Sequence, residues 1–248
     1  MRQQFGTTPA GPGEYRDNTA GLVRPKDAAT LIIVRAGAQP TLLMGKRAAS
    51  HRFMPNKFVF PGGRLEAIDQ RLRVEGELSQ PVMGRLRKAT RKGVTDRKLR
   101  GLALAAIRET YEETGLVVGR PAEQSVNTRH RVWRQYLAQG AEPPLEHMDF
   151  IARAITPPYR TKRFDTRFFL IHDQFIFNDP EHISHVSGEL HQLHWLTLEQ
   201  ARDLDLPAVT RWAIDIVEKR LELAPLEQLK QSAPFVRFTG QQAISIEL

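Results

Sequence analysis

Hydrophobic residues recur along the chain in short runs that are typical of β-strands. Runs rich in branched and aromatic side chains, each bounded by Gly, Pro or polar residues, predict six strands. These strands are Ala28–Val34, Thr41–Lys46, Phe58–Phe60, Phe150–Thr156, Arg167–His172 and Leu190–Trp195. The short segment Ala36–Pro40 is expected to join the first two strands as a hairpin.

A second pattern, with hydrophobic residues three and four positions apart, predicts helices. Leu102, Ala103, Ala106 and Ile107 would line one face of a helix, and Gly115 is placed to end that helix in a left-handed conformation. Further helices are expected at Thr128–Gln139, Leu198–Asp203 and Ala208–Leu223. Strands and helices mixed in this order are typical of an α/β fold, here an α/β/α sandwich with a mixed sheet.

Composition divides the chain into an arm and one domain. Residues 1–25 are rich in Gly, Pro and polar residues, which predicts a flexible N-terminal arm, and residues 26–248 are long enough for a single domain with a full core. The absence of cysteine excludes disulfide scaffolds, cysteine-bound zinc and thiol nucleophiles. There is neither a membrane-spanning apolar run nor the apolar core of a signal peptide. We therefore expect a soluble, cytoplasmic protein with no membrane partner. Whether the protein forms a homodimer is left open by the sequence.

Three carboxylates are concentrated in one predicted helix, in the segment RETYEETGL at residues 108–116. Glu109, Glu112 and Glu113 stand at positions i, i+3 and i+4, so they project from one face, where Arg108 can pair with Glu112. Such a face is either a solvated acidic surface or a site for a divalent cation. The hydrophobic stripe that precedes it favours the cation site.

An upstream segment, FVFPGGRLEAID at residues 58–69, runs from a short strand into a glycine turn and then into two carboxylates. Together with RETYEETGL it resembles the Nudix hydrolase signature, which is a Gly, five residues, a Glu, and later R-E-x-x-E-E-x-G and an aliphatic residue. Gly63 takes the place of the signature glycine, and Asp69 stands where the family has Glu. Arg108 follows Gly63 by 45 positions where the usual motif has 14, so an insertion of 31 residues splits the motif. We expect a basic helical insertion at about residues 70–100 within a Nudix α/β/α sandwich.

The resemblance implies chemistry as well as fold. It assigns Glu109, Glu112 and Glu113 to Mg²⁺ or Mn²⁺, with Arg108 orienting a glutamate. Gly62 and Gly63 are assigned to the substrate site, and a carbonyl of their turn is a candidate for an extra metal ligand. Hard divalent cations prefer carboxylate oxygens, neutralise phosphoryl groups and lower the pKa of a bound water. Glu189 matches a loop glutamate that binds metal or activates water in related enzymes; the alternative is an exposed loop acid.

Two further segments narrow the resemblance to the coenzyme A diphosphatase branch, of the peroxisomal type with its bacterial relatives. LLMGKRAASHRFMPNKFVFPGGRLEAID, residues 42–69, is similar to the pattern that precedes the Nudix motif in that branch, and Arg47 and Arg52 match its two arginines. ITPPYRTKRFDTRFFLI, residues 155–171, is the second. Several positions of the first segment depart from the pattern: Ala48, Asn56, Phe58 and Glu66. The implied reaction converts coenzyme A or acyl-CoA into 3′,5′-ADP and (acyl-)phosphopantetheine.

Positive charge is concentrated in the insertion, in a chain whose net charge is +8. The cations are Arg85, Arg87, Lys88, Arg91, Lys92, Arg97, Lys98 and Arg100, with Asp96 as the acid among them. This cluster could hold the 3′-phosphate of coenzyme A, bind RNA, or form a solvated basic helix. Nucleic acid is the less favoured partner, since the segment has almost no aromatic residues for base stacking.

Two alternatives to coenzyme A hydrolysis stay open. The same fold and chemistry would serve a pyrophosphatase of ADP-ribose, NADH or capped RNA, because the acidic helix recognises only the diphosphate of a small-molecule substrate. A catalytically silent binder of nucleic acid or a protein is the second alternative. The three retained glutamates argue against it, since an inactive site has no need for mutually repelling carboxylates.

Overall fold

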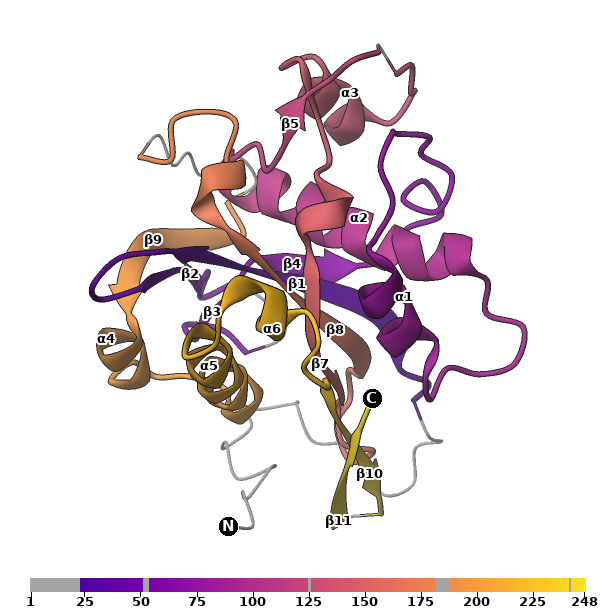
Figure 1. The fold of residues 1–248 in the computed structure, drawn as a ribbon. Helices are drawn as coiled ribbons and strands as arrows, with labels where there is room; N and C mark the ends of the chain where they lie inside the picture. The colour runs from indigo at the N-terminus through magenta and orange to yellow at the C-terminus, as the bar shows by residue number, and fades with distance from the viewer. Residues whose placement is uncertain (1–22, 51–53, 125, 182–187, 241) are drawn as a thin grey trace.

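The computed structural model describes residues 23–50, 54–124, 126–181, 188–240 and 242–248. Most of the β-strands in these residues belong to one mixed sheet (Figure 1). The sheet has the order β11-β10-β7-β8-β1-β2-β3, with β4 paired to β1 and β9 paired to β2. β1 runs parallel to β8 and β7 parallel to β10, while the other neighbours are antiparallel. The strands are β1 Lys26–Arg35, β2 Thr41–Arg47, β3 Phe58–Val59, β4 Gly62–Arg64, β7 Asp149–Ile155, β8 Phe164–His172, β9 Leu190–Thr197, β10 Pro234–Thr239 and β11 Gln242–Glu247. β5 Arg120–Pro121 and β6 Ala141–Glu142 form a separate pair.

Helices cover both faces of the sheet. α1 and α2 lie over one face with α3 beyond them, and α4 and α5 lie over the other (Figure 1). Their bounds are α1 Gln80–Arg87, α2 Asp96–Thr114, α3 Arg131–Leu137, α4 Leu198–Arg202, α5 Ala208–Leu221 and α6 Pro225–Gln228, with 3₁₀ turns at Leu145–His147 and Asp173–Phe175. The molecule is therefore a three-layer α/β/α sandwich, as the hydrophobic pattern predicted.

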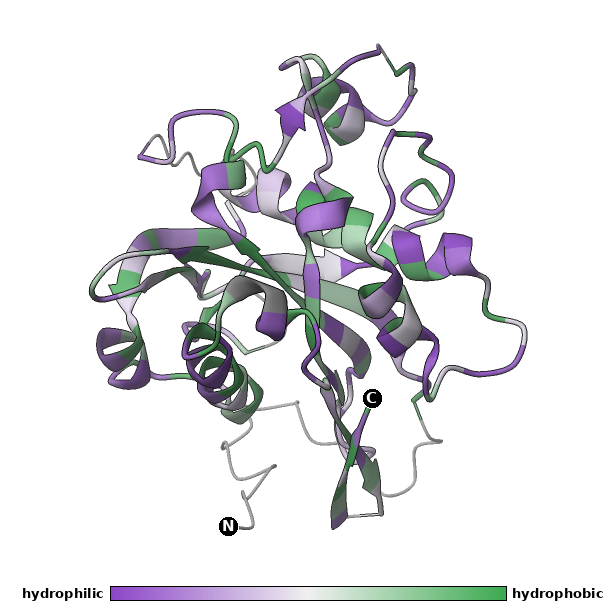
Figure 2. Cartoon of the chain, viewed as in Figure 1, coloured by the Kyte–Doolittle hydropathy of each residue, from purple (hydrophilic) through white to green (hydrophobic). Residues whose placement is uncertain are grey.

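The central strand β1 contributes side chains to both hydrophobic cores, one on each face of the sheet. Leu31 and Ile33 belong to the core beneath α2, while Ile32 and Val34 belong to the core beneath α5, because successive side chains of a strand point to opposite faces. All four are fully buried. Figure 2 shows the hydrophobic residues gathered in these central strands and the polar residues on the outer helices.

Helix α2 begins earlier than the acidic motif and ends where the sequence predicted. Thr95 caps its first turn by accepting a hydrogen bond from the Lys98 amide, and Gly115 ends it at φ 73°, in the left-handed region that favours glycine. The insertion expected at about residues 70–100 is only partly helical. It contains α1 and two irregular stretches, and its last residues form the first turn of α2.

The other predicted elements are present within a few residues of their expected bounds. The Ala36–Pro40 hairpin is confirmed by the pairing of Val34 with Leu42. The β10–β11 hairpin and the short β4 were not predicted. Most of the expected N-terminal arm, residues 1–22, lies outside the described residues. None of the helices in the described part of the chain combines the length and apolar character that crossing a bilayer requires.

Candidate functional site

The three glutamates of the acidic motif lie on the last turns of α2, against the glycine strand β4. Glu113 is buried, and its Oε2 accepts a hydrogen bond from the Gly62 amide at 2.9 Å. The Glu109 carboxylate lies on Gly63 so closely that a Cβ atom at this position would overlap it. The side chains of Glu109 and Glu112 are 17% and 30% exposed, so the cluster opens to solvent at Glu112.

Close packing explains why the sequence has two glycines here. β4 pairs with β1 so that Gly62 lies opposite Thr30 and Gly63 opposite Ala29. Gly62 has a φ of 157°, and a Cβ on it would meet the backbone of β1. Because neither residue has a Cβ atom, the backbone of β4 can lie directly against β1 at Gly62 and against the Glu109 carboxylate at Gly63.

Burial and mutual repulsion raise the pKa values of two carboxylates in this cluster, although two arginines lie close to them. Burial raises the pKa of Glu113 well above its ordinary value, and the neighbouring charge of Glu109 raises it further. Burial also raises the pKa of Glu109 to about 7, against the lowering effect of Arg108, and Glu112 and Glu189 add to the increase. Carboxylates that are crowded and desolvated in this way favour a bound cation.

Two residues from distant parts of the sequence complete the cluster. β2 pairs with β9, and the Ala48 amide donates to the carbonyl of Glu189 at 3.1 Å, which brings Glu189 beside the end of β2. The charge of the half-buried Arg47 interacts with Glu113, Glu189 and Glu109. The sequence-predicted residues Arg47 and Glu189 thus lie with the acidic helix, whereas the predicted Arg52 falls outside the described residues.

Arg108 is a buried connector. Its Nη1 donates to Glu109 at 3.0 Å and to Glu112 at 3.4 Å, the second being the i,i+4 pair expected from the sequence. Its Nε and Nη2 donate to the two oxygens of Asp69 at 2.8 and 3.0 Å. Arg108 therefore orients two of the three motif glutamates.

These residues fit a hard divalent cation by their donor chemistry. Carboxylate oxygens are the ligands that Mg²⁺ and Mn²⁺ prefer, and burial with neighbouring carboxylates raises the pKa of Glu109 and Glu113 despite the opposing charges of Arg108 and Arg47. The side chains are not preassembled, since in the described part of the chain no three His, Asp or Glu residues surround a common point. Glu109 and Glu112 each accept a hydrogen bond from Arg108 through one carboxylate oxygen.

A cavity of about 190 Å³ lies next to the cluster, on the face of the sheet that α5 covers. Its wall is mainly apolar and includes four phenylalanines: Phe60, Phe164, Phe168 and Phe238. Among the described residues, the charged side chains of the wall are Arg47 and the buried Arg160. Gly62 and Gly63 also line it, so the two glycines border both the carboxylates and the cavity.

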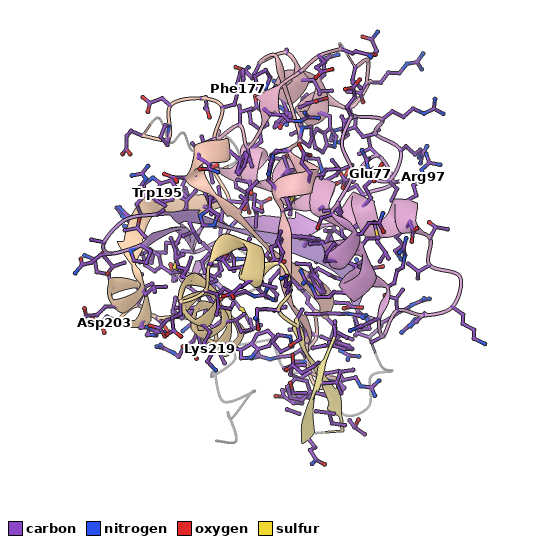
Figure 3. The ribbon with its side chains drawn as sticks, in the orientation of Figure 1. Glu77, Arg97, Phe177, Trp195, Asp203 and Lys219 are labelled. Atoms are coloured by element: carbon purple, nitrogen blue, oxygen red, sulfur yellow. The ribbon has the colours of Figure 1, made fainter. Side chains whose placement is uncertain are left out.

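Several cations of the insertion pair with other parts of the protein, so the insertion does not present all its charges on one surface. Arg85 pairs with Asp149 inside the protein, Lys98 with Asp27, and Arg100 donates to the carbonyls of residues 72, 74 and 76. Lys88, Arg91 and Lys92 are exposed in the loop before α2. Arg97 and Glu77 project on this side of the molecule, away from Trp195 of β9 (Figure 3).

Helix geometry separates this loop from the carboxylates. Asp96 and Glu112 are 16 residues apart along α2, and at 1.5 Å per residue the two ends of the helix are roughly 24 Å apart. A 3′-phosphate on the ribose that carries the diphosphate would lie far closer to the carboxylates than that. The loop is thus too distant to hold it.

Two features of the site escaped the sequence analysis. Trp133 donates its indole N–H to Asp69, and Arg160 lines the cavity. Trp133 gave the signal of an ordinary hydrophobic residue in an amphipathic helix. Arg160 lies within the segment of residues 155–171 that carried the family resemblance, but nothing in the spacing marked it.

Comparison with solved structures identifies the fold. A Nudix hydrolase from Alicyclobacillus acidocaldarius is similar to this chain with a TM-score of 0.59 and 24% identity, over 85% of this chain and 98% of that chain. More distant are the NUDIX domain of Shewanella oneidensis NrtR in complex with ADP-ribose (TM-score 0.47, 11% identity, 83% and 94% covered) and a MutT Nudix hydrolase from Burkholderia pseudomallei (0.45, 16%, 79% and 99%). No protein-family model matches the chain, and no curated protein does. The expected Nudix α/β/α fold is confirmed.

Proposed function

We propose that this chain, which has the Nudix hydrolase fold, is a divalent-metal-dependent enzyme that hydrolyses the diphosphate of a nucleoside diphosphate derivative. We further propose coenzyme A or acyl-CoA as substrate and 3′,5′-ADP and (acyl-)phosphopantetheine as products. One observation carries the proposal. Glu109 and Glu113 are packed on the glycine strand β4, and the same glycines border a cavity large enough for part of an organic ligand.

Each residue of the cluster has a role in this reaction. Glu109, Glu112 and Glu113 would hold Mg²⁺ or Mn²⁺, which when bound neutralises phosphoryl oxygens and lowers the pKa of an attacking water. Arg108 keeps two of these carboxylates oriented. Glu189 lies beside them just before β9 and is the proposed general base, because this residue is exposed and its carboxylate can reach solvent. Arg47 would donate to the phosphates.

The cavity supports a substrate with an apolar and an anionic part. Aromatic and aliphatic side chains would cover the pantetheine or acyl portion, while Arg47 and Arg160 supply positive charge within the same wall. Coenzyme A carries a 3′-phosphate that ADP-ribose and NADH lack. An arginine at the cavity, rather than the distant insertion loop, is the proposed partner of that phosphate.

The first test is a substrate panel in ¹⁸O-water with Mg²⁺ or Mn²⁺. Purified protein is incubated with coenzyme A, acetyl-CoA, dephospho-coenzyme A, ADP-ribose, NADH and capped RNA, and the products are analysed by mass spectrometry. We expect 3′,5′-ADP and phosphopantetheine, with label in one phosphate product only, and slower cleavage of dephospho-coenzyme A. Preferred cleavage of ADP-ribose, NADH or capped RNA would keep the enzyme class and replace the substrate.

The acidic helix is tested with near-isosteric variants. Glu112→Gln and Glu113→Gln each remove a proposed metal ligand, so turnover should fall by about 100-fold or more while the circular dichroism spectrum is unchanged. Near wild-type turnover in both variants at saturating Mg²⁺ would remove the metal assignment. Absence of hydrolysis of every panel compound by the wild-type protein would favour a non-catalytic binder.

A further inference from the structure

Asp69 is a fully buried carboxylate in the loop that follows β4, and each of its two oxygens accepts two hydrogen bonds. Its Oδ1 accepts from Arg108 Nε and from Trp133 Nε1 at 3.0 Å, and its Oδ2 accepts from Arg108 Nη2 and from the Glu66 amide at 2.9 Å. A buried carboxylate requires such partners to offset the cost of leaving water. Four donors fix both oxygens in position.

Arg108 transmits the position of Asp69 to the acidic face. The guanidinium is held from two sides, by Asp69 and by the Arg64 carbonyl, which accepts from Nη2 at 2.9 Å. Only Nη1 is left to point at Glu109 and Glu112. A rotation of the Asp69 carboxylate would therefore turn the guanidinium and change the positions of both glutamates.

Trp133 is the member of this network that comes from outside the motif. It lies on α3, in the segment between α2 and β7, where the chain rejoins the main sheet, and α3 lies beyond α2 from that sheet (Figure 1). The indole is fully buried and packs edge-on against Tyr136, which packs edge-on against Tyr111 of α2. This aromatic contact anchors α3 on α2 and aims the indole N–H at Asp69.

We propose that Trp133 is a positioning residue of the acidic site: its N–H fixes the Asp69 carboxylate, which through Arg108 sets the positions of Glu109 and Glu112 for a divalent cation. The inference rests on the proposed metal-dependent function. It adds that a helix outside the motif is coupled to metal affinity. Groups that orient metal ligands without touching the metal commonly change its affinity 10- to 100-fold when they are lost.

A matched pair of variants on the same helix separates positioning from packing. Trp133→Phe removes the donor to Asp69. Tyr136→Phe removes a buried hydroxyl whose 2.6 Å hydrogen bond goes to the Val118 carbonyl and not to the network. Both tyrosine and tryptophan contribute to the α2–α3 contact, so both variants should lose thermal stability. Substituting Asp69 itself is less informative, because it would leave the Arg108 charge buried and unpaired.

The measurements are the dissociation constant of Mn²⁺ by calorimetry and the melting temperature in EDTA. We expect Trp133→Phe to weaken Mn²⁺ binding about tenfold and Tyr136→Phe to leave it within twofold of wild type. Replacement of Trp133 by benzothienylalanine keeps the ring size but has no N–H, so it should weaken Mn²⁺ binding as Trp133→Phe does, and it serves if the phenylalanine variant does not fold. Unchanged Mn²⁺ affinity in the variants without the N–H would overturn the inference.

Comparing Mn²⁺ binding with hydrolysis separates failure of this inference from failure of the proposed function. Glu112→Gln should weaken Mn²⁺ binding directly, which establishes that the titration reports the acidic site. If Mn²⁺ binds and Trp133→Phe weakens it, but no panel compound is hydrolysed, the positioning role stands and the proposed reaction fails. If the wild-type protein binds no Mn²⁺, both are overturned.

Discussion

Two adjacent glycines of β4 have different neighbours, and this difference predicts different defects. A Cβ on Gly63 would overlap the Glu109 carboxylate, which is the movable end of a side chain. A Cβ on Gly62 would meet the backbone of β1, which cannot move without disturbing the sheet. The first change should therefore displace a proposed metal ligand, while the second should strain the fold.

Gly63→Ala should lower kcat by about tenfold or more with little change in melting temperature. Gly62→Ala should lower the melting temperature by roughly 5 °C, since backbone strain costs about 1–3 kcal/mol and each kcal/mol corresponds to about 2–4 °C in a protein of this size. Steady-state kinetics and thermal denaturation of both variants decide the matter. Full activity of Gly63→Ala would show that the Glu109 carboxylate is free to move without consequence.

The residues of the site were predictable where their signal is local. Glu109, Glu112 and Glu113 share a face because of helical spacing, and this needs no knowledge of the rest of the chain. Trp133 was not predictable, because its partner Asp69 is 64 positions away and a buried Trp in an amphipathic helix has many ordinary explanations. Pairings of this kind are created by the packing of α3 on α2, which no local pattern encodes.

At the scale of elements, the start of α2 is fixed to the sheet by a charge contact. The Asp27 carboxylate at the beginning of β1 accepts from Lys98 at 2.6 Å and from Arg167 of β8 at 2.8 Å. Burial alone would raise the pKa of Asp27, but the Lys98 hydrogen bond and the Arg167 charge outweigh it and hold the pKa below its ordinary value. The ionised form is thus stabilised in the folded state, and this stability is lost as the pH falls through the folded-state pKa.

Asp27→Asn should lower the free energy of unfolding by about 1 kcal/mol at pH 7, a figure reduced for the partial exposure of the pair. The difference from wild type should shrink as the pH falls from 7 to 3, because the aspartate is protonated first in the unfolded chain and at lower pH in the folded protein. Urea denaturation at both pH values measures it. Asp96→Asn is the control, because its pair with Arg87 is exposed and should contribute little. An equal loss at pH 3 and pH 7 would contradict the charge contact.

Most elements were predictable, since β1, β2, β7, β8 and α5 are long enough for their hydrophobic period to show. The exceptions have physical reasons. β11 exposes most of its residues and β4 has only Gly and Arg, so neither has a hydrophobic pattern. The start of α2 was assigned to the insertion because its first turn is rich in Lys and Arg. In the structure, Thr95 caps this turn and the Leu99 side chain is buried.

At the scale of the molecule, the positive charges behind the net charge of +8 are not gathered on one basic surface. Arg85, Arg153 and Arg220 are buried beside Asp149 or Asp165, and Arg100 binds carbonyl groups. Three exposed cations of the insertion, Lys88, Arg91 and Lys92, lie in the loop before α2, at the far end of this helix from the glutamates. Charge beyond a Debye length of about 8 Å is strongly screened at physiological salt. Their field should therefore contribute little to a reaction at the acidic site.

Simultaneous substitution of Lys88, Arg91 and Lys92 by Gln should accordingly leave kcat/KM for coenzyme A within about twofold of wild type in 0.15 M salt. Arg47→Gln is the comparison: Arg47 lines the cavity and interacts with the carboxylates, and a charge-assisted hydrogen bond contributes about 1.5–3 kcal/mol, so kcat/KM should fall about tenfold or more. Electrophoretic mobility shift with single-stranded RNA is measured on the same proteins. If the triple variant loses hydrolysis of coenzyme A, the loop acts at the site despite its distance, and the separation along α2 is not the deciding factor. If it loses only RNA binding, the loop is a nucleic-acid surface that works independently of the acidic helix.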